Sequence, residues 1–194
     1  MKGRDTGISW LAGVRYRNGL IAALVVLASG GQVAAQDMPA MPKVAPSPIA
    51  CPATPPALPA ELSGWNQRKA LPASADARSA TRLEPGRAVD GGLRPTPQVR
   101  FALRPEKPGG SVSFGGIYAL TVKQAGNYRV ALGSAAWIDV LKDGAAVMSI
   151  AHGHGPDCSG IRKMVDFTLE PGEYVLQISA NPEAKLPLLV TRLP

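Results

Sequence analysis

The chain has 194 residues, of which 45% are hydrophobic and 18% are charged, and its formal net charge is +7. This length provides for one domain, and the hydrophobic content is sufficient for a packed core. The 21 glycines and 19 prolines exclude long helices and coiled coils, because both residue types destabilise a helix interior. Two histidines and two cysteines are too few for a zinc finger, a haem-ligand pair or a multi-disulfide scaffold.

The N-terminal segment has the three parts of a secretory signal peptide. An apolar run, Leu20–Ala28, follows a basic region and precedes the small residues Val33-Ala34-Ala35. The basic residues are Lys2, Arg4, Arg15 and Arg17. Because a bilayer-spanning helix needs about 20 apolar residues, the run is too short for one, although an uncleaved anchor is the alternative. We predict a signal peptide over 1–35, no transmembrane span after its cleavage, and a mature protein that is periplasmic or secreted.

Residues 36–62 are predicted to be a disordered, proline-rich linker. Eight prolines lie within Met38–Ala60, and they favour an extended conformation that cannot join a packed core. The folded domain is therefore expected over 63–194. From Glu61 to Lys107, nine Lys or Arg residues alternate with five acidic residues, without an aromatic ladder. This pattern is typical of a solvated surface, so nucleic acid is not expected as a partner.

The folded region shows hydrophobic residues at a period of two. In Tyr118–Val122 and Tyr174–Ile178, for example, large apolar side chains alternate with smaller or polar ones. Asp143-Gly144 and Pro171-Gly172 supply turn signals between such runs. We predict an all-β fold, an antiparallel two-sheet β-sandwich of jelly-roll type with about eight strands; a helical turn fits only within Leu58–Arg82. The predicted strands are 98–104, 111–122, 127–133, 136–142, 145–151, 163–169, 173–180 and 186–192.

Two segments of the chain share a strand, a glycine turn and a tyrosine two residues after the glycine. One is LTVKQAGNYRV, with Gly126 and Tyr128, and the other is FTLEPGEYVL, with Gly172 and Tyr174. The ring would be buried, while the hydroxyl would cap the backbone at the sheet corner. The pattern resembles bacterial pre-peptidase C-terminal domains and related galactose-binding-like sandwiches. That resemblance implies a sandwich fold and an accessory module of the kind found on secreted enzymes.

The segment AHGHGPDCSGIRK, residues 151–163, holds both histidines of the chain. In an extended backbone, His152 and His154 would share one side and could bind a metal ion, with Asp157 as a third ligand. The alternative is a polar loop without metal. This block also resembles half of a cupin metal motif, and short exported bacterial proteins identified as homogentisate 1,2-dioxygenases. That resemblance implies an iron-dependent dioxygenase, although a complete cupin has a later histidine and none follows His154.

Cys51 and Cys158 are the only cysteines. An exported protein meets an oxidising environment, so we predict a disulfide that fixes the linker to the histidine-containing loop. Closing a loop of about 100 residues would stabilise the fold by about 4–5 kcal/mol in the chain-entropy model. A buried free thiol at Cys158, or an intermolecular bridge through Cys51, is the alternative.

Four further residues are candidates for ligand contacts. Trp137 and Asp139 share one strand face, where an exposed indole would stack on a sugar and the acid would accept its hydroxyl hydrogen bond. The alternative, which we favour, places Trp137 in the core. Arg162 and Lys163 would hold an anion or would simply end a solvated loop.

The sequence therefore favours an exported, non-enzymatic β-sandwich that binds or docks to an envelope component or another exported protein, without a cofactor. No complete set of catalytic residues can be assembled from the motifs present. The alternatives are a small dioxygenase using iron or another divalent metal, and a metal-binding protein, both through His152, His154 and Asp157.

Overall fold

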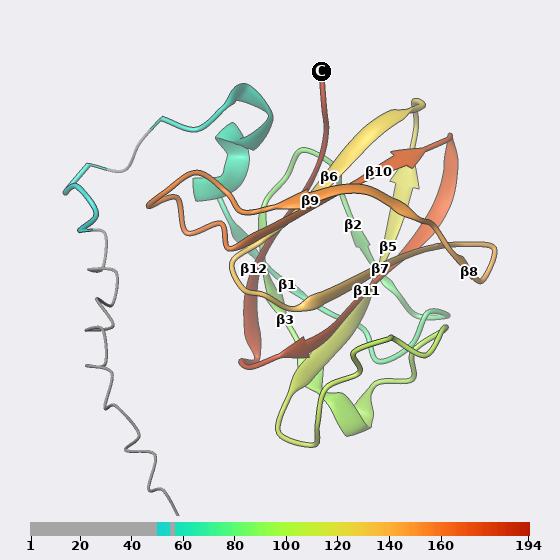
Figure 1. Ribbon diagram of the computed structural model, residues 1–194. Helices are drawn as coiled ribbons and strands as arrows, with labels where there is room; N and C mark the ends of the chain where they lie inside the picture. The colour runs from blue at the N-terminus through green and yellow to red at the C-terminus, as the bar shows by residue number, and fades with distance from the viewer. Residues whose placement is uncertain (1–49, 55–56) are drawn as a thin grey trace, which may run out of the picture. The chain divides into compact units, whose positions relative to one another are not determined.

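The computed structural model describes residues 50–54 and 57–194, which fold as two β-sheets packed face to face (Figure 1). The predicted signal peptide and most of the predicted linker lie outside the described residues. Within the described part, no helix is long and apolar enough to cross a membrane. The predicted all-β two-sheet sandwich is confirmed.

The first sheet has the strand order β1-β3-β12-β6-β10-β9. Its strands are β1 (Lys69–Pro72), β3 (Val89–Gly92), β12 (Lys185–Arg192), β6 (Gly126–Leu132), β10 (Lys163–Leu169) and β9 (Ser149–Gly153). The second sheet has the order β2-β5-β11-β7-β8, and β4 also pairs with β5. Its strands are β2 (Thr81–Leu83), β5 (Phe114–Val122), β11 (Gly172–Asn181), β7 (Trp137–Lys142), β8 (Ala145–Ala146) and β4 (Arg94–Pro95).

The main hydrophobic core lies between the two sheets, as the period-two pattern predicts. Tyr118 and Leu120 of β5 and Leu176 and Ile178 of β11 face Val130 and other apolar residues of the first sheet, and all are buried. Burial of each such side chain contributes about 1.5–3 kcal/mol. The core therefore gives the sandwich most of its stability.

The two glycine-tyrosine corners form equivalent hydrogen bonds. The hydroxyl of Tyr128 donates to the carbonyl oxygen of Gln124 (2.9 Å), and that of Tyr174 donates to the carbonyl oxygen of Glu170 (2.9 Å). Each tyrosine thus reaches the backbone four residues upstream, with its ring in the core. The repeated sequence pattern builds the same corner in each sheet.

The sheets are mixed, because β1–β3 and β2–β5 are parallel pairs, whereas the sequence predicted antiparallel pairing throughout. Between residues 69 and 95 the chain alternates between the sheets, placing β1 and β3 in the first and β2 and β4 in the second. These strands have two to four residues each. They were not predicted, because such short segments do not show a hydrophobic period.

The prediction of a strand over 98–104 is wrong. The segment begins at the end of η2 (Thr96–Gln98) and continues without strand pairing beyond a single bridge at Arg100. Its backbone is held instead by the Gln177 side chain, which accepts from the N–H groups of Ala102 and Leu103 (2.6 and 3.2 Å) and donates to the Leu103 carbonyl (3.0 Å). Alternating apolar residues therefore pack here against a sheet without joining it.

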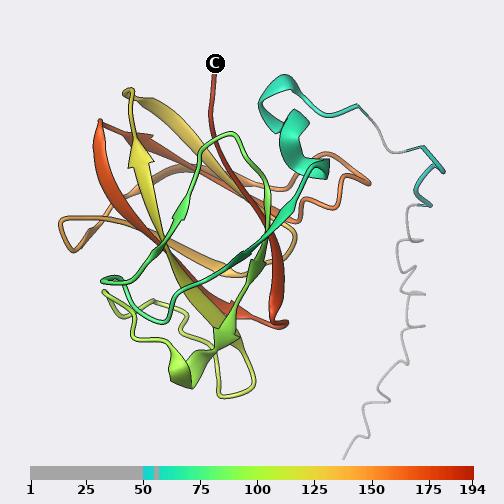
Figure 2. The same cartoon turned by 180° about the vertical axis from the view of Figure 1, so that it is seen from behind.

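A second, smaller hydrophobic cluster covers the outer face of the first sheet. Leu62 and Trp65 of η1 (Ala60–Asn66) pack there against Ala131, Leu189 and Ile161. Both views place η1 beside the loop that connects β9 to β10 (Figures 1 and 2). The packed body therefore extends back into residues that we assigned to the linker, and the single predicted helical turn is η1.

An ion pair accompanies this second cluster. Arg129 on β6 binds both oxygens of Asp166 on β10 (2.8 Å each), and its third nitrogen lies 3.9 Å from Glu61 of η1. The hydrogen bonds that Arg129 donates to Asp166 are the main cause of the raised pKa of Arg129. Charge therefore also links η1 to the sheet beneath it.

Candidate functional site

The histidine-containing segment lies at an open edge of the first sheet. His152 belongs to β9 and pairs with Val165 of β10, whereas His154 lies beyond the end of the strand. Both imidazoles are exposed, and Nδ1 of His154 lies 2.8 Å from the carbonyl oxygen of Arg162. A carbonyl accepts only, so Nδ1 carries a proton and only Nε2 of His154 has a lone pair for a metal.

The three predicted metal ligands do not form a ligand set. Among residues 50–54 and 57–194, no group of three or more His, Cys, Asp or Glu side chains is placed to hold a metal ion. His154 and Asp157 line an open hollow beside Cys51 and Cys158, but His152 does not contribute to it. An iron centre of the kind that the dioxygenase resemblance implies does not fit these residues.

The predicted disulfide between Cys51 and Cys158 is present. The loop on the Cys158 side is fixed further by Trp65, whose indole N–H donates to the Ser159 carbonyl (3.0 Å). Ile161 then buries its side chain in the second hydrophobic cluster. The histidine-containing loop is thus part of a structural junction between η1, the linker and β10.

Trp137 is not a core residue, contrary to the favoured prediction. On β7, Ile138 and Val140 enter the core, so Trp137 and Asp139 lie on the outer face of the second sheet. The half-buried indole donates its N–H to Oδ1 of Asp139 (2.9 Å). The ammonium groups of Lys163 and Lys107 lie 5.3 and 5.2 Å from the ring centroid.

Three of the four predicted ligand-contact residues, Trp137, Asp139 and Lys163, therefore lie together. Oδ2 of Asp139 is buried without a hydrogen-bond partner within the described residues, and burial raises the pKa of this carboxyl despite the indole N–H. Burial also lowers the pKa of Lys163, whose ammonium donates to the Ala136 carbonyl (2.9 Å).

The fourth predicted ligand-contact residue, Arg162, does not join these three but lines the hollow beside the disulfide. We name Trp137, Asp139, Lys163 and Lys107 the indole cluster; the lysines cover its ring, so a sugar would have to displace them to stack.

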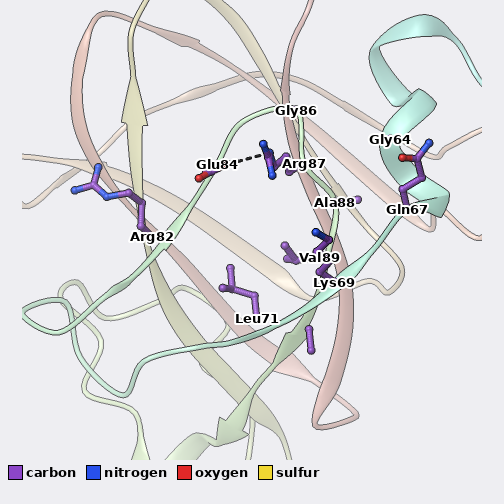
Figure 3. A pocket seen from close by; sticks show the side chains of 11 residues that line it. Gly64, Gln67, Lys69, Leu71, Arg82, Glu84, Gly86, Arg87, Ala88 and Val89 are labelled. Carbon is purple, nitrogen blue, oxygen red and sulfur yellow. Dashed lines mark ion pairs between the residues drawn. The ribbon is translucent and has the colours of Figure 1, made fainter.

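A groove lies at the opposite edge of the sandwich, where sequence reasoning predicted no site (Figure 3). It has a volume of about 460 Å³ and lies along the edge strands β1 and β2, one from each sheet. The apolar side chains of Leu71 and Val89 line it, and Arg82 lies on the side opposite Gln67 of the η1 end. A neighbouring hollow of about 500 Å³ shares Arg82 and Glu84, so the two are contiguous. We name these two hollows together the edge groove.

The spacing of the two edges depends on Tyr118. From β5 its hydroxyl donates to the carbonyl oxygen of Leu71 on β1 (3.3 Å), connecting the sheets beside the groove. Gly91 makes room for this contact, because a Cβ there would lie 2.6 Å from the tyrosine oxygen. Burial raises the pKa of Tyr118, so its hydroxyl stays protonated and remains a donor.

The edge groove is positively charged. Its charged side chains are Lys69, Arg82, Arg87, Lys123 and Glu84. Glu84 pairs with Arg87 (2.9 Å), and Arg82 reaches Glu173 at 3.7 Å. Lys69 and Lys123 form no ion pair within the part of the chain that the structure describes. The groove therefore attracts negatively charged ligands.

The sequence contains a weak signal for this groove. Lys69 precedes Leu71 by two residues, and in Thr81-Arg82-Leu83 a cation lies between two inward-directed positions. The Arg82 pattern is that of a strand with one charged face, whereas Lys69 and Leu71, two residues apart, share one face of β1. The alternation of charges over residues 61–107 instead suggested a uniformly solvated surface.

Comparison with models of known protein families and with curated proteins gives no match. The function must therefore be inferred from the geometry and charge of the described residues.

Proposed function

We propose that the protein is an exported, non-enzymatic binding module that docks an extended acidic segment of another exported protein in the edge groove. The observation that carries this proposal is a basic groove running along two free strand edges. The predicted accessory role of sandwich modules agrees with it. The alternative functions through a bound metal require a ligand set that the described residues do not form.

The free edges favour a polypeptide as ligand. β1 and β2 are the terminal strands of their sheets, so each presents backbone N–H and C=O groups that lack a neighbouring strand in the described fold. An extended peptide can pair with such an edge and obtain main-chain hydrogen bonds. Leu71 and Val89 would receive its apolar side chains.

The charges of the groove select among peptides. Lys69 and Lys123 are exposed and available, and the Glu84–Arg87 pair adds no net charge. Acidic side chains of the peptide would face the lysines, and apolar ones would face Leu71 and Val89. A basic peptide would meet like charge.

The disulfide supports a location outside the cytoplasm. Disulfides persist in the periplasm and in secreted proteins, whereas the cytoplasm keeps most thiols reduced. Cys51 and Cys158 are both bonded, and the structure describes no free cysteine. Together with the predicted signal peptide, this favours a periplasmic or secreted protein.

Binding is tested with a fluorescein-labelled peptide of alternating glutamate and valine, measured by anisotropy at low ionic strength. The double variant Lys69→Glu/Arg82→Glu should weaken binding by roughly tenfold or more, because it reverses two charges of the groove. The matched control Arg104→Glu changes an exposed charge on residues 101–110, away from the groove, and should leave affinity nearly unchanged.

Two further probes complete the design. A lysine-valine peptide of the same length should not bind, and oligogalacturonate tests whether acidic sugars compete. Equal loss of affinity in the groove variant and the Arg104→Glu control would contradict the proposal, as would tighter binding of the sugar acid than of the peptide.

A further inference from the structure

The edge strand β9 carries no Lys, Arg, Asp, Glu or Pro, and a single bulge is the only irregularity in its pairing with β10. An edge strand is often protected against pairing with another copy by charge or proline. At the other end of this sheet, Lys69 of β1 would repel a second Lys69, and Pro72 has no N–H to donate. Residues 144–156, by contrast, contain no Lys, Arg, Asp or Glu. Pairing of this edge is therefore not opposed by fixed charge.

The same edge exposes apolar side chains. Met148 is 83% exposed and Ile150 is 55% exposed, although large apolar side chains in a monomeric sandwich are usually covered. Ile150 is the extra residue of a bulge, since Ala151 and Ser149 pair with the consecutive residues Asp166 and Phe167 of β10. Bulges at edges direct a side chain outward, and here the side chain is hydrophobic.

We propose that β9 pairs antiparallel with β9 of a second copy of this chain, so that the first sheets of the two molecules form one continuous sheet. A second copy is the occupant that these charges favour, because two segments without Lys, Arg, Asp or Glu meet without repulsion between fixed charges, and an acidic or basic partner strand would have no counter-charge here. In an antiparallel pair related by a two-fold axis, each copy contributes the same β9 residues to the interface.

This dimer does not depend on a ligand in the edge groove, but it determines how many edge grooves the assembly has. β1 and β9 are the two ends of the first sheet, so pairing through β9 leaves both copies of β1 free at the outer ends. The dimer would carry two edge grooves. Because β9 has only five residues, we expect an interface of the weak class, below about 1,200 Å², and dimerisation that depends on concentration.

The test is sedimentation velocity of the purified mature protein over a concentration series up to its solubility limit. The wild-type protein should shift from monomer to dimer, and the double variant Met148→Lys/Ile150→Lys should remain monomeric at every concentration. Val112→Lys is the matched control, because Val112 is 87% exposed but lies between η2 and β5, and it should dimerise normally.

Hydrogen exchange locates the interface independently of any variant. The amides of Ser149–Gly153 should exchange more slowly as the wild-type concentration rises. A wild-type protein that is monomeric throughout the series would overturn the proposal, because β9 would then not pair with a second copy of this chain. A dimer that persists in the lysine variant would also overturn it, because its interface would lie elsewhere; circular dichroism confirms that the variants are folded.

Discussion

The indole N–H of Trp137 donates to Oδ1 of Asp139 at 2.9 Å, and this leaves Oδ2 of the same carboxylate buried without a partner within the described residues. The hydrogen bond connects two residues on the outer face of β7, beneath the ammonium groups of Lys107 and Lys163. A half-satisfied buried carboxylate costs stability, and it makes the indole cluster sensitive to pH.

Substitution of Asp139 by Asn should change how stability depends on pH. Burial raises the pKa of Asp139 above its ordinary value of 3.8, so the folded protein holds this proton more tightly than the unfolded chain. The protonated carboxyl therefore contributes to the free energy of unfolding. This contribution is fully present below the pKa of Asp139 in the unfolded chain and is lost as the pH rises through its higher pKa in the folded protein. The Asp139→Asn side chain does not ionise, so the variant should not lose stability over this pH range.

Urea unfolding at a series of pH values measures this effect. The free energy of unfolding of Asp139→Asn minus that of the wild type should increase from about pH 4 upward and then level off. The amide oxygen still accepts from the indole, so packing should be preserved. A difference that does not vary with pH would show that the carboxyl is not stabilised in its protonated form.

Gln177 should control the order of residues 101–110. The Gln177→Leu variant keeps a similar shape but leaves the N–H groups of Ala102 and Leu103 and the Leu103 carbonyl without their partner. We expect a loss of about 2 kcal/mol in the free energy of unfolding and faster hydrogen exchange of these two amides. Ser179→Ala is the control: it removes only the hydrogen bond to the Lys107 carbonyl and should leave both amides protected.

Loss of the disulfide should destabilise the fold without preventing it. The bond joins residues 107 positions apart, and the Cys51→Ser/Cys158→Ser variant should lose about 2–5 kcal/mol in guanidinium unfolding. Reduction of the wild-type protein should produce the same loss, which provides an internal comparison. Two free thiols in non-reducing peptide maps of the wild type would refute the pairing.

The two acidic partners of Arg129 should differ in importance. Asp166→Ala removes a buried, two-point ion pair and should cost about 3 kcal/mol, because Arg129 keeps only a distant partner. Glu61→Gln removes a contact of 3.9 Å and should cost less than about 1 kcal/mol. Urea unfolding of both variants measures the ranking, and equal losses would contradict it.

The long strands could be predicted from the sequence, because runs of about five residues of alternating hydrophobicity report directly on a half-buried sheet. Tyr118 and Tyr174 are examples, and both lie in the core where the pattern placed them. The short strands between residues 69 and 95 could not, since their position depends on which edge of which sheet is open. The parallel pairing of β1 with β3 and of β2 with β5 could not be predicted for the same reason.

The candidate site was only partly predictable for a related reason. Counting cysteines was enough for the disulfide, and strand alternation was enough to bring Trp137 and Asp139 together. Alternation alone does not state which face of β7 is buried, so Trp137 was assigned to the wrong side. The edge groove combines residues from both sheets, and such proximity is a property of the fold rather than of any local pattern.

The most direct test of the proposed docking function is an NMR titration of the ¹⁵N-labelled protein with the glutamate-valine peptide. We predict that the amide signals of Lys69–Leu71 and Arg82–Glu84 shift on binding, whereas the indole N–H signal of Trp137 stays in place. Shifts confined to Trp137 and residues 101–110, with the groove signals unchanged, would contradict a ligand site at the edge groove.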